Sequence, residues 1–192
     1  MYATRRINIP IALTLIRLII APLLLPLLVF YLFPSKSIYT HITLALLCAI
    51  FCLTDFLDGY LARRYGQVTA LGKLLDPIAD KFFISATLIA LVAVQKLYFL
   101  WAILLIGREF LMNGLRAFSA QQQRTIPVSY LGKLKTTFQG ILLFVIILNP
   151  YQWLGTYSSL AWATLESSLL AITLFLSFYS AYKYYQGSTA RG

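Results

Sequence analysis

Acidic residues are rare in this sequence and are concentrated in one place. The chain contains six Asp and Glu residues, and four of them fall in a short stretch between strongly apolar segments: Asp55, Asp58, Asp76 and Asp80. The first pair has i,i+3 spacing and the second has i,i+4 spacing, so each pair projects from one face of a helix. Converging carboxylates at a membrane boundary repel one another unless a cation holds them charged. All-oxygen ligation suits a hard divalent ion, Mg²⁺ or Mn²⁺.

Small residues continue the helix face that begins at Asp55. Gly59 and Ala62 follow at i+4 and i+7 and leave backbone against which a ligand can lie flat. Arg63, at the end of the same helix, can meet a phosphate. The alternative is a set of solvated loop carboxylates beside a membrane span. Loop charges, however, need not keep helical spacing or alternate with Gly and Ala.

The composition indicates a membrane protein with several spans. The chain has 192 residues, of which 60% are hydrophobic and 11% are charged, and its mean hydropathy is +0.78. These values exclude an ordinary soluble domain, and the length permits about six spans of roughly 20 residues. The net charge of +10 is spread among the apolar segments. Anionic lipids and phosphate-bearing substrates are therefore the expected partners, and nucleic acid is not.

We expect an all-α membrane protein of six transmembrane helices, with residues 1–192 forming one catalytic domain. A short interfacial segment, residues 2–12, precedes spans at residues 15–33, 38–64, 71–95, 97–120, 130–148 and 158–185. The basic start resembles that of a signal peptide, but the apolar run after it carries Arg17 and two prolines and has no small-residue cleavage site. Arg17 either snorkels to the surface or faces a substrate.

Several single residues in the second and third spans lead to specific expectations. Pro77 is tolerated if it lies in the first turns of the third helix, where amide donors have no helical partner. His41 lies at the end of the second span opposite to the acidic pair, and we expect it at the surface. Cys48 and Cys52 are expected to be small reduced core residues.

Ionisable residues interrupt the fourth predicted span. Glu109, Asn113 and Arg116 form a stripe at i, i+4 and i+7, with Arg108 beside it. Ionised side chains at that depth are costly and usually line a cavity. A purely structural Arg/Glu pair that joins two helices is the alternative for Glu109.

The start of the fifth span is basic. Lys133, Thr136 and Thr137 share a helix face and present an ammonium group and two hydroxyls, which suits a phosphate. Lys133 and Lys135 can also be ordinary positive-inside anchors. With a cytoplasmic N terminus, every Lys and Arg except Lys36 and Lys96 falls on the cytoplasmic side. The positive-inside rule therefore places both termini and the carboxylates on that side.

The acidic stretch reads DxxDGxxAR, then eight residues, then GxxxDxxxD. This pattern resembles the signature of the CDP-alcohol phosphotransferases, membrane enzymes that move a substituted phosphate from a CDP-linked donor onto an alcohol. Further segments resemble the bacterial members that use glycerol 3-phosphate: Asn8-Ile9-Pro10, Leu75 to Lys81, Arg108-Glu109, Leu115-Arg116 and Gly132 to Thr136. One departure is that many members have a second Asn after the Pro, where this chain has Ile11-Ala12.

The resemblance implies a six-helix membrane fold, usually dimeric, in the bacterial cytoplasmic membrane, with a cavity open to the cytoplasm and to lipid. The implied metal ligands are Asp55, Asp58, Asp76 and Asp80, and Asp80 is also the implied general base. The implied CDP-binding residues are Asp58, Gly59, Ala62, Arg63 and Gly72. The implied reaction transfers a phosphatidyl group from CDP-diacylglycerol to glycerol 3-phosphate and releases CMP.

The acceptor is argued from basic residues of the fourth and fifth spans. The cluster that favours an acceptor with a phosphate consists of Arg108, Arg116, Lys133 and Lys135. Two other functions stay open. A sister enzyme with inositol phosphate or serine as acceptor would share the core motif, and a cation channel or transporter would also place carboxylates in the membrane, although it would not need the Gly, Ala and Arg positions.

Overall fold

The computed structural model describes the backbone of residues 9–64, 70–121, 130–152, 154 and 156–189. Within these ranges, the side chains are also described, except at residues 9–19, 21, 54–64, 70–77, 79–80, 120, 130, 152 and 187–189. The four aspartates of the acidic stretch and the expected CDP-binding residues therefore have a described backbone, and their side chains lie outside the described set.

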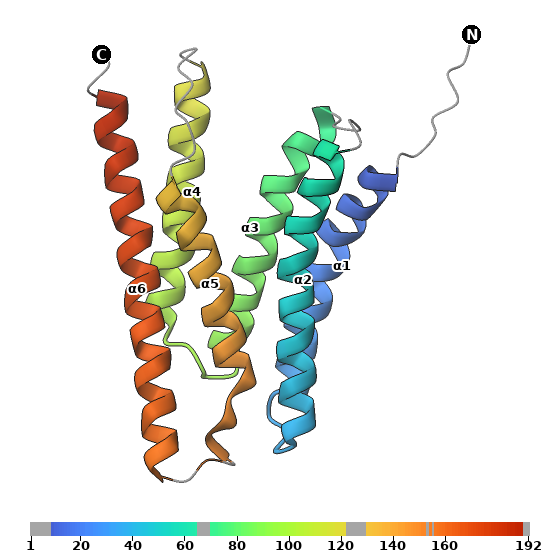
Figure 1. The fold of residues 1–192 in the computed structure, drawn as a ribbon, viewed down its shortest axis with the longest axis vertical. Helices are drawn as coiled ribbons and strands as arrows, with labels where there is room; N and C mark the ends of the chain where they lie inside the picture. Colours follow the sequence, from blue (N-terminus) through green and yellow to red (C-terminus); the bar gives the residue numbers. More distant parts are fainter. Residues whose placement is uncertain (1–8, 65–69, 122–129, 153, 155, 190–192) are drawn as a thin grey trace.

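Six α-helices make up the described fold, with no strand in the ranges given above. They are α1 (Ile9–Leu32), α2 (Ile38–Arg64), α3 (Ala70–Ala93), α4 (Phe99–Gln121), α5 (Tyr130–Leu148) and α6 (Thr156–Thr189), with a short 3₁₀ turn, η1 (Pro150–Gln152), before α6. This result confirms the all-α prediction. α1 begins and α6 ends at the same end of the bundle (Figure 1).

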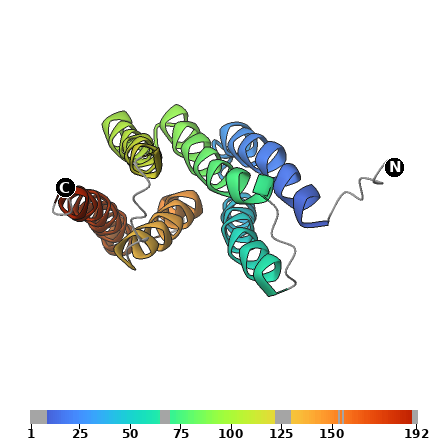
Figure 2. The same cartoon turned by 90° about the horizontal axis from the view of Figure 1, so that it is seen from above.

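The helices form two groups of three. α3 packs along α1, which also contacts α2, and α6 packs against α5 and α4. Contacts of α2 with α5 and of α3 with α4 join the groups. Figure 2, seen along the bundle from above, shows α1, α2 and α3 on one side and α4, α5 and α6 on the other.

The bundle is apolar both inside and outside. Fully buried leucines such as Leu44, Leu88 and Leu143 form the core, while large apolar side chains also cover the outer faces, with Phe110 69% and Phe175 67% exposed. Exposed apolar surface on this scale marks contact with lipid. Among the described residues, two helical stretches are long and apolar enough to cross a membrane, Leu131–Leu148 and Thr156–Gln186. The six-span topology stays a prediction.

Two prolines show where the observed helices differ from the expected ones. α1 begins at Ile9 and so includes residues assigned to the interfacial segment. Pro10 is accommodated in its first turn, where an amide hydrogen is not needed. α3 begins at Ala70, one residue before the expected start, so Pro77 lies seven residues into the helix and beyond its first turn. The missing amide leaves the carbonyl of Lys73 without its usual helical donor.

The prediction that His41 lies at the surface is wrong. Its side chain is fully buried, with Nδ1 3.2 Å from the carbonyl oxygen of Ile147 and Nε2 3.0 Å from that of Ser35. The ring of Phe33 packs edge-on against the imidazole. The carbonyl groups at the end of α5 have no helical donor, so a buried imidazole meets a need that the sequence pattern does not reveal. Cys48 and Cys52 are free thiols, buried and half-buried respectively, as expected.

A polar cluster lies at the end of the bundle opposite to the acidic stretch. Lys96 Nζ, after α3, donates to Asn149 Oδ1 at 2.7 Å and lies 5.3 Å from the centre of the Tyr151 ring. Tyr151 Oη donates to Glu166 Oε2 at 2.7 Å, and Trp162 Nε1 donates to Glu166 Oε1 at 3.1 Å. These contacts join the α3–α4 turn to the α5–α6 turn. They give Glu166 a structural role.

Candidate active site

An aromatic contact between α2 and α3 places the acidic stretch. The rings of Phe51 and Phe83 meet with centroids 5.7 Å apart. Asp55 follows Phe51 at i+4, and Asp80 precedes Phe83 by three residues, so each lies on the same helix face as the ring beside it. Asp58 and Asp76 continue these faces one turn further on, at seven residues from the rings. All four acidic positions of α2 and α3 therefore lie within seven residues of this aromatic contact.

Helix direction places the two acidic pairs at a common level. α2 ends at Arg64 and α3 begins at Ala70, so α2 runs toward the short connection between them and α3 runs away from it (Figure 1). Both pairs lie on the connection side of the Phe51–Phe83 contact. Both acidic pairs therefore lie at the end of the bundle where α2 ends and α3 begins.

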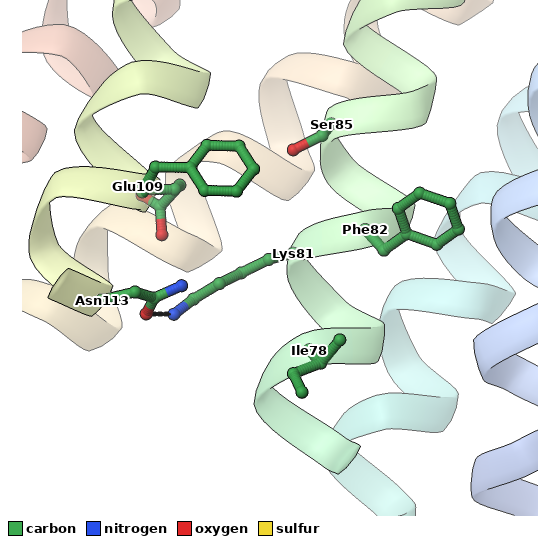
Figure 3. Close-up of a pocket in the computed structure, with 7 residues that line it drawn as sticks. Ile78, Lys81, Phe82, Ser85, Glu109 and Asn113 are labelled. Carbon is green, nitrogen blue, oxygen red and sulfur yellow. Dashed lines mark hydrogen bonds between the residues drawn. The ribbon is translucent and has the colours of Figure 1, made fainter. Parts of the chain in front are cut away.

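A cavity of about 220 Å³ lies beside this position, between α3 and α4. Its lining combines apolar and polar side chains, drawn in Figure 3: Ile78, Lys81, Phe82, Ser85, Glu109, Phe110 and Asn113. Lys81 Nζ donates to Asn113 Oδ1 across the cavity (Figure 3). Because Lys81 directly follows Asp80, this contact links the acidic stretch to the polar stripe of α4.

One turn further along α4, an ionic cluster joins three helices. Glu109 Oε1 accepts hydrogen bonds from Arg108 Nη1 at 2.9 Å and from Lys135 Nζ on α5. Arg108 Nε donates to the carbonyl oxygen of Ser177 on α6 at 2.9 Å, and its Nη2 donates to the hydroxyl of Ser180. Lys135 and Arg108 are 3% and 8% exposed. The buried cations are therefore held in fixed positions by α4, α5 and α6 together.

The four basic residues expected at an acceptor phosphate divide into two pairs. Arg108 and Lys135 meet at Glu109, whereas Arg116 and Lys133 are exposed. The structural Arg/Glu pairing that the sequence left open for Glu109 is present, and it includes Lys135 as well. Buried ion pairs contribute little net stability, because desolvation offsets their attraction. Fold stability alone therefore does not explain this cluster.

The hydroxyls of Thr136 and Thr137, which the sequence suggested for a phosphate, form hydrogen bonds within α5 instead. Thr136 Oγ1 donates to the carbonyl oxygen of Gly132 at 3.1 Å, and Thr137 Oγ1 donates to that of Lys133 at 3.2 Å. Helix carbonyl groups at i−4 are the nearest acceptors for threonine hydroxyls in a membrane helix. The buried polar face of α5 is instead the face of Lys135.

Sequence reasoning missed the contribution of α6. Ser177 and Ser180, which contact Arg108, lie in a helix to which the sequence assigned no function. A signal was present, because Thr173, Ser177 and Ser180 recur at helical spacing within an apolar run. Polar residues at such spacing in a membrane helix usually face another helix.

The fold and the site together define the class of protein. Apolar side chains cover the outside of the helices, and ionic side chains are buried between them beside a cavity. Ionisable groups in such positions mark proteins that handle polar substrates within or at a membrane. The chain is therefore a membrane protein with a polar site between its helices.

Comparison with known proteins identifies the family. Residues 7–179 match the family model described as CDP-alcohol phosphatidyltransferase, so the chain belongs to the CDP-alcohol phosphatidyltransferase family of enzymes. The match includes α1 to α5, most of α6 and both acidic pairs, in agreement with the resemblance found from the motif.

Three curated relatives share most of the chain, and each is named CDP-diacylglycerol--glycerol-3-phosphate 3-phosphatidyltransferase. The protein of Rickettsia typhi is 34% identical over 180 residues, which cover 93% of this chain and 96% of the relative. The protein of Salmonella choleraesuis is 35% identical over 192 residues, which cover 96% of each chain. The protein of Escherichia coli strain K12 is 38% identical over 153 residues, which cover 76% of this chain and 80% of the relative.

Proposed function

We propose that this protein transfers the phosphatidyl group of CDP-diacylglycerol to sn-glycerol 3-phosphate. The products are phosphatidylglycerol phosphate and CMP, and the reaction serves the synthesis of phosphatidylglycerol and cardiolipin. The name shared by the curated relatives supports the choice of substrates. The structural observation that supports the proposal is the Phe51–Phe83 contact, because it joins α2 and α3 close to their acidic positions.

The chemistry of the acidic stretch fits a divalent cation. Its four carboxylates are hard oxygen ligands on α2 and α3, which suits Mg²⁺ or Mn²⁺. The residues that would hold the ion are Asp55, Asp58, Asp76 and Asp80. A bound ion of this kind would offset the negative charge of the donor diphosphate and of the departing CMP. In the described part of the chain, no further group of three His, Cys, Asp or Glu side chains could hold a metal.

In the proposed reaction, Asp80 acts as general base. It accepts the proton of the glycerol hydroxyl as that oxygen attacks the lipid-linked phosphorus. The new P–O bond forms while the bond from this phosphorus to the CMP oxygen breaks, and CMP leaves with the electron pair. The CDP group is held along α2 and the start of α3 by the residues of the motif: Asp58, Gly59, Ala62, Arg63 and Gly72.

The acceptor phosphate binds beside the cavity, where Glu109 of its lining meets Arg108 and Lys135. Arg108 and Lys135 supply fixed positive charge there, and their burial strengthens a charge-assisted hydrogen bond. Arg116 and Lys133 lie on the exposed surface toward the same end of the bundle and attract the acceptor to the site. Lys81, which reaches Asn113, lies between the acceptor side and Asp80.

The proposal includes a location and an assembly. The protein is placed in the bacterial cytoplasmic membrane, with both termini and the active site on the cytoplasmic side, because that orientation puts almost all Lys and Arg residues inside. It is proposed to work as a homodimer, as the resemblance implies. Residues 1–192 are proposed to form a single catalytic domain.

The deciding experiment is an assay of CMP release by the purified protein in detergent micelles that contain CDP-diacylglycerol. We expect release with glycerol 3-phosphate and Mg²⁺ or Mn²⁺, and none after chelation. Inositol phosphate and serine serve as alternative acceptors. Faster release with either of them would assign the protein to a sister activity, and metal flux without CMP release would indicate a channel or transporter.

A further inference from the structure

Within the part of the chain that the structure describes, two buried polar groups beside the ionic cluster have no hydrogen-bond partner. Both amide atoms of Gln139, Nε2 and Oε1, are buried without a hydrogen bond, as is the hydroxyl of Ser177. The side chains of Gln139 and Ser177 are both 0% exposed. Buried amides and hydroxyls in native proteins are nearly always paired, because leaving them unpaired in an apolar interior is costly. These groups therefore point to a ligand.

The unpaired groups border the proposed acceptor site. Gln139 follows Lys135 at i+4, so the two side chains share one face of α5. Lys135 contacts Glu109 on α4. Ser177 lies at the same cluster, because its carbonyl oxygen accepts the hydrogen bond from Arg108 Nε at 2.9 Å. A ligand that reaches Arg108 and Lys135 is thus adjacent to Gln139 and Ser177.

The order of contacts gives the direction in which the ligand lies. From the acidic stretch, the polar side chains proceed through Lys81 and Asn113 to Glu109 and Lys135, and then, one turn deeper along α5, to Gln139. If the acceptor hydroxyl lies at Asp80, the opposite end of the acceptor would lie on the side of Lys135 and Gln139. In glycerol 3-phosphate the opposite end is the phosphate.

The chemistry of the unpaired groups suits a phosphate held partly by charge and partly by neutral donors. Each guanidinium nitrogen of Arg108 already donates one hydrogen bond: Nε to the carbonyl oxygen of Ser177, Nη1 to Glu109 and Nη2 to the hydroxyl of Ser180. A Gln amide offers two N–H donors and a Ser hydroxyl offers one, and the terminal oxygens of a phosphate monoester are strong acceptors. The amide carbonyl can in turn accept from the three-donor ammonium of Lys135, which shares its helix face.

We propose that Gln139 and Ser177 form the inner, uncharged wall of the acceptor pocket and donate hydrogen bonds to the acceptor phosphate. Arg108 and Lys135 supply the charge, and Gln139 and Ser177 make the pocket selective for a phosphate monoester. This inference rests on the proposed function, since it assigns the acceptor of that reaction to these two residues.

The test replaces Gln139 by Met, which has a similar length and volume and no hydrogen-bonding amide. We expect Gln139→Met to raise the apparent KM for glycerol 3-phosphate about tenfold and to leave the KM for CDP-diacylglycerol unchanged. The thermal midpoint in detergent should stay the same or rise, because an unpaired buried amide has been removed. Ser177→Ala should act in the same direction with a smaller effect.

Inorganic phosphate tests which part of the acceptor is contacted. Its inhibition constant against glycerol 3-phosphate should also rise about tenfold in Gln139→Met. Unchanged inhibition by phosphate, together with a raised KM, would overturn the assignment of the phosphate to Gln139. The matched control is Thr173→Val, one turn from Ser177, whose buried hydroxyl already donates to the carbonyl oxygen of Leu169 at 2.7 Å. It should leave both constants unchanged.

The outcomes separate this inference from the proposed function. A wild-type KM in Gln139→Met, with a raised thermal midpoint, would show that Gln139 is only an internal polar group and would overturn the inference alone. Absence of wild-type turnover would refute the proposed function. Calorimetric binding of inorganic phosphate to the wild type and the variant would then still decide the role of Gln139. If the Met variant does not fold, Gln139→Glu keeps the shape and should weaken phosphate binding still more by repulsion.

Discussion

Lys133 and Lys135 are two residues apart in the sequence and differ completely in environment. Lys135 is buried against Glu109, whereas Lys133 is exposed. If Lys135 holds the acceptor phosphate, Lys135→Met should lose a charge-assisted contact of about 1.5–3 kcal/mol, which is about ten- to a hundredfold in kcat/KM for glycerol 3-phosphate. Lys133→Met should change it only a few-fold, because exposed charges are screened.

Steady-state kinetics with each substrate varied in turn measure this difference. The KM for CDP-diacylglycerol should stay near the wild-type value in both variants, and Arg63→Ala should show the reverse pattern. Lys183→Met, at an exposed lysine that lies over the Tyr179 ring, is the control. Equal losses of kcat/KM for glycerol 3-phosphate in Lys133→Met and Lys135→Met would contradict the assignment of the phosphate contact to the buried Lys135.

The acidic stretch makes a separate prediction about metal dependence. Asp55→Asn, Asp58→Asn or Asp76→Asn removes one anionic ligand, so metal affinity and activity should fall together, and excess Mg²⁺ or Mn²⁺ should restore part of the activity. Titration of CMP release with each ion measures the effect. Glu166→Gln, at the other end of the bundle, should keep the wild-type metal dependence. Full wild-type turnover after exhaustive chelation would exclude a metal site.

The sequence predicts the site better where the motif is local than where it depends on packing. The spacing of Asp55, Asp58, Asp76 and Asp80 assigns them to helix faces without a structure, because helical geometry is local. The burial of Gln139 and of His41 could not be predicted in this way. Both depend on which face of one helix another helix covers, and a single polar residue in an apolar run does not reveal that.

At the scale of helices, the number of elements follows from the alternation of apolar runs and polar connections. Their ends are less predictable. α1 begins earlier than expected and α6, Thr156–Thr189, extends beyond the expected 158–185 in both directions, because helices continue past the apolar segment until the backbone is forced to turn. At Asn149, after α5, a positive φ of 41° provides that turn.

The contacts after α5 predict a response to alkaline pH. Burial raises the pKa of Tyr151, and the hydrogen bond that it donates to Glu166 raises it further. The folded state thus favours the neutral phenol. Its contribution to stability is complete below the ordinary tyrosine pKa of about 10 and is lost as pH rises above that value.

Thermal unfolding in detergent from about pH 8 to about pH 11 measures this contribution. The midpoint of the wild type should exceed that of Tyr151→Phe at the lower pH, and the difference should shrink above about pH 10. Tyr157→Phe is the matched control, since Tyr157 is 91% exposed. If the difference in midpoint between the wild type and Tyr151→Phe stayed constant with pH, the raised pKa of Tyr151 would make no contribution to stability.

For the molecule as a whole, the six helices bring the start of α1 and the end of α6 to one end of the bundle (Figure 1). If this end is cytoplasmic, a cysteine at Lys36, in the α1–α2 turn, should react with a membrane-impermeant maleimide added outside cells. A cysteine at Gln121, at the end of α4, should react only after the membrane is permeabilised. The protein should first carry Cys48→Ala and Cys52→Ala. The reverse labelling pattern would overturn the proposed orientation.

The Phe51–Phe83 contact has an electrical consequence for the cell. If the cavity between α3 and α4 opens toward the cytoplasm, as in the proposed orientation, it shortens the insulating part of the bilayer, and ions driven by the membrane potential would cross wherever water filled the remainder. The two rings lie directly beneath the acidic positions, and the core beyond them contains leucines such as Leu44, Leu88 and Leu91. In the proposed orientation, this apolar layer would separate charged substrates bound on the cytoplasmic side from the opposite side of the membrane.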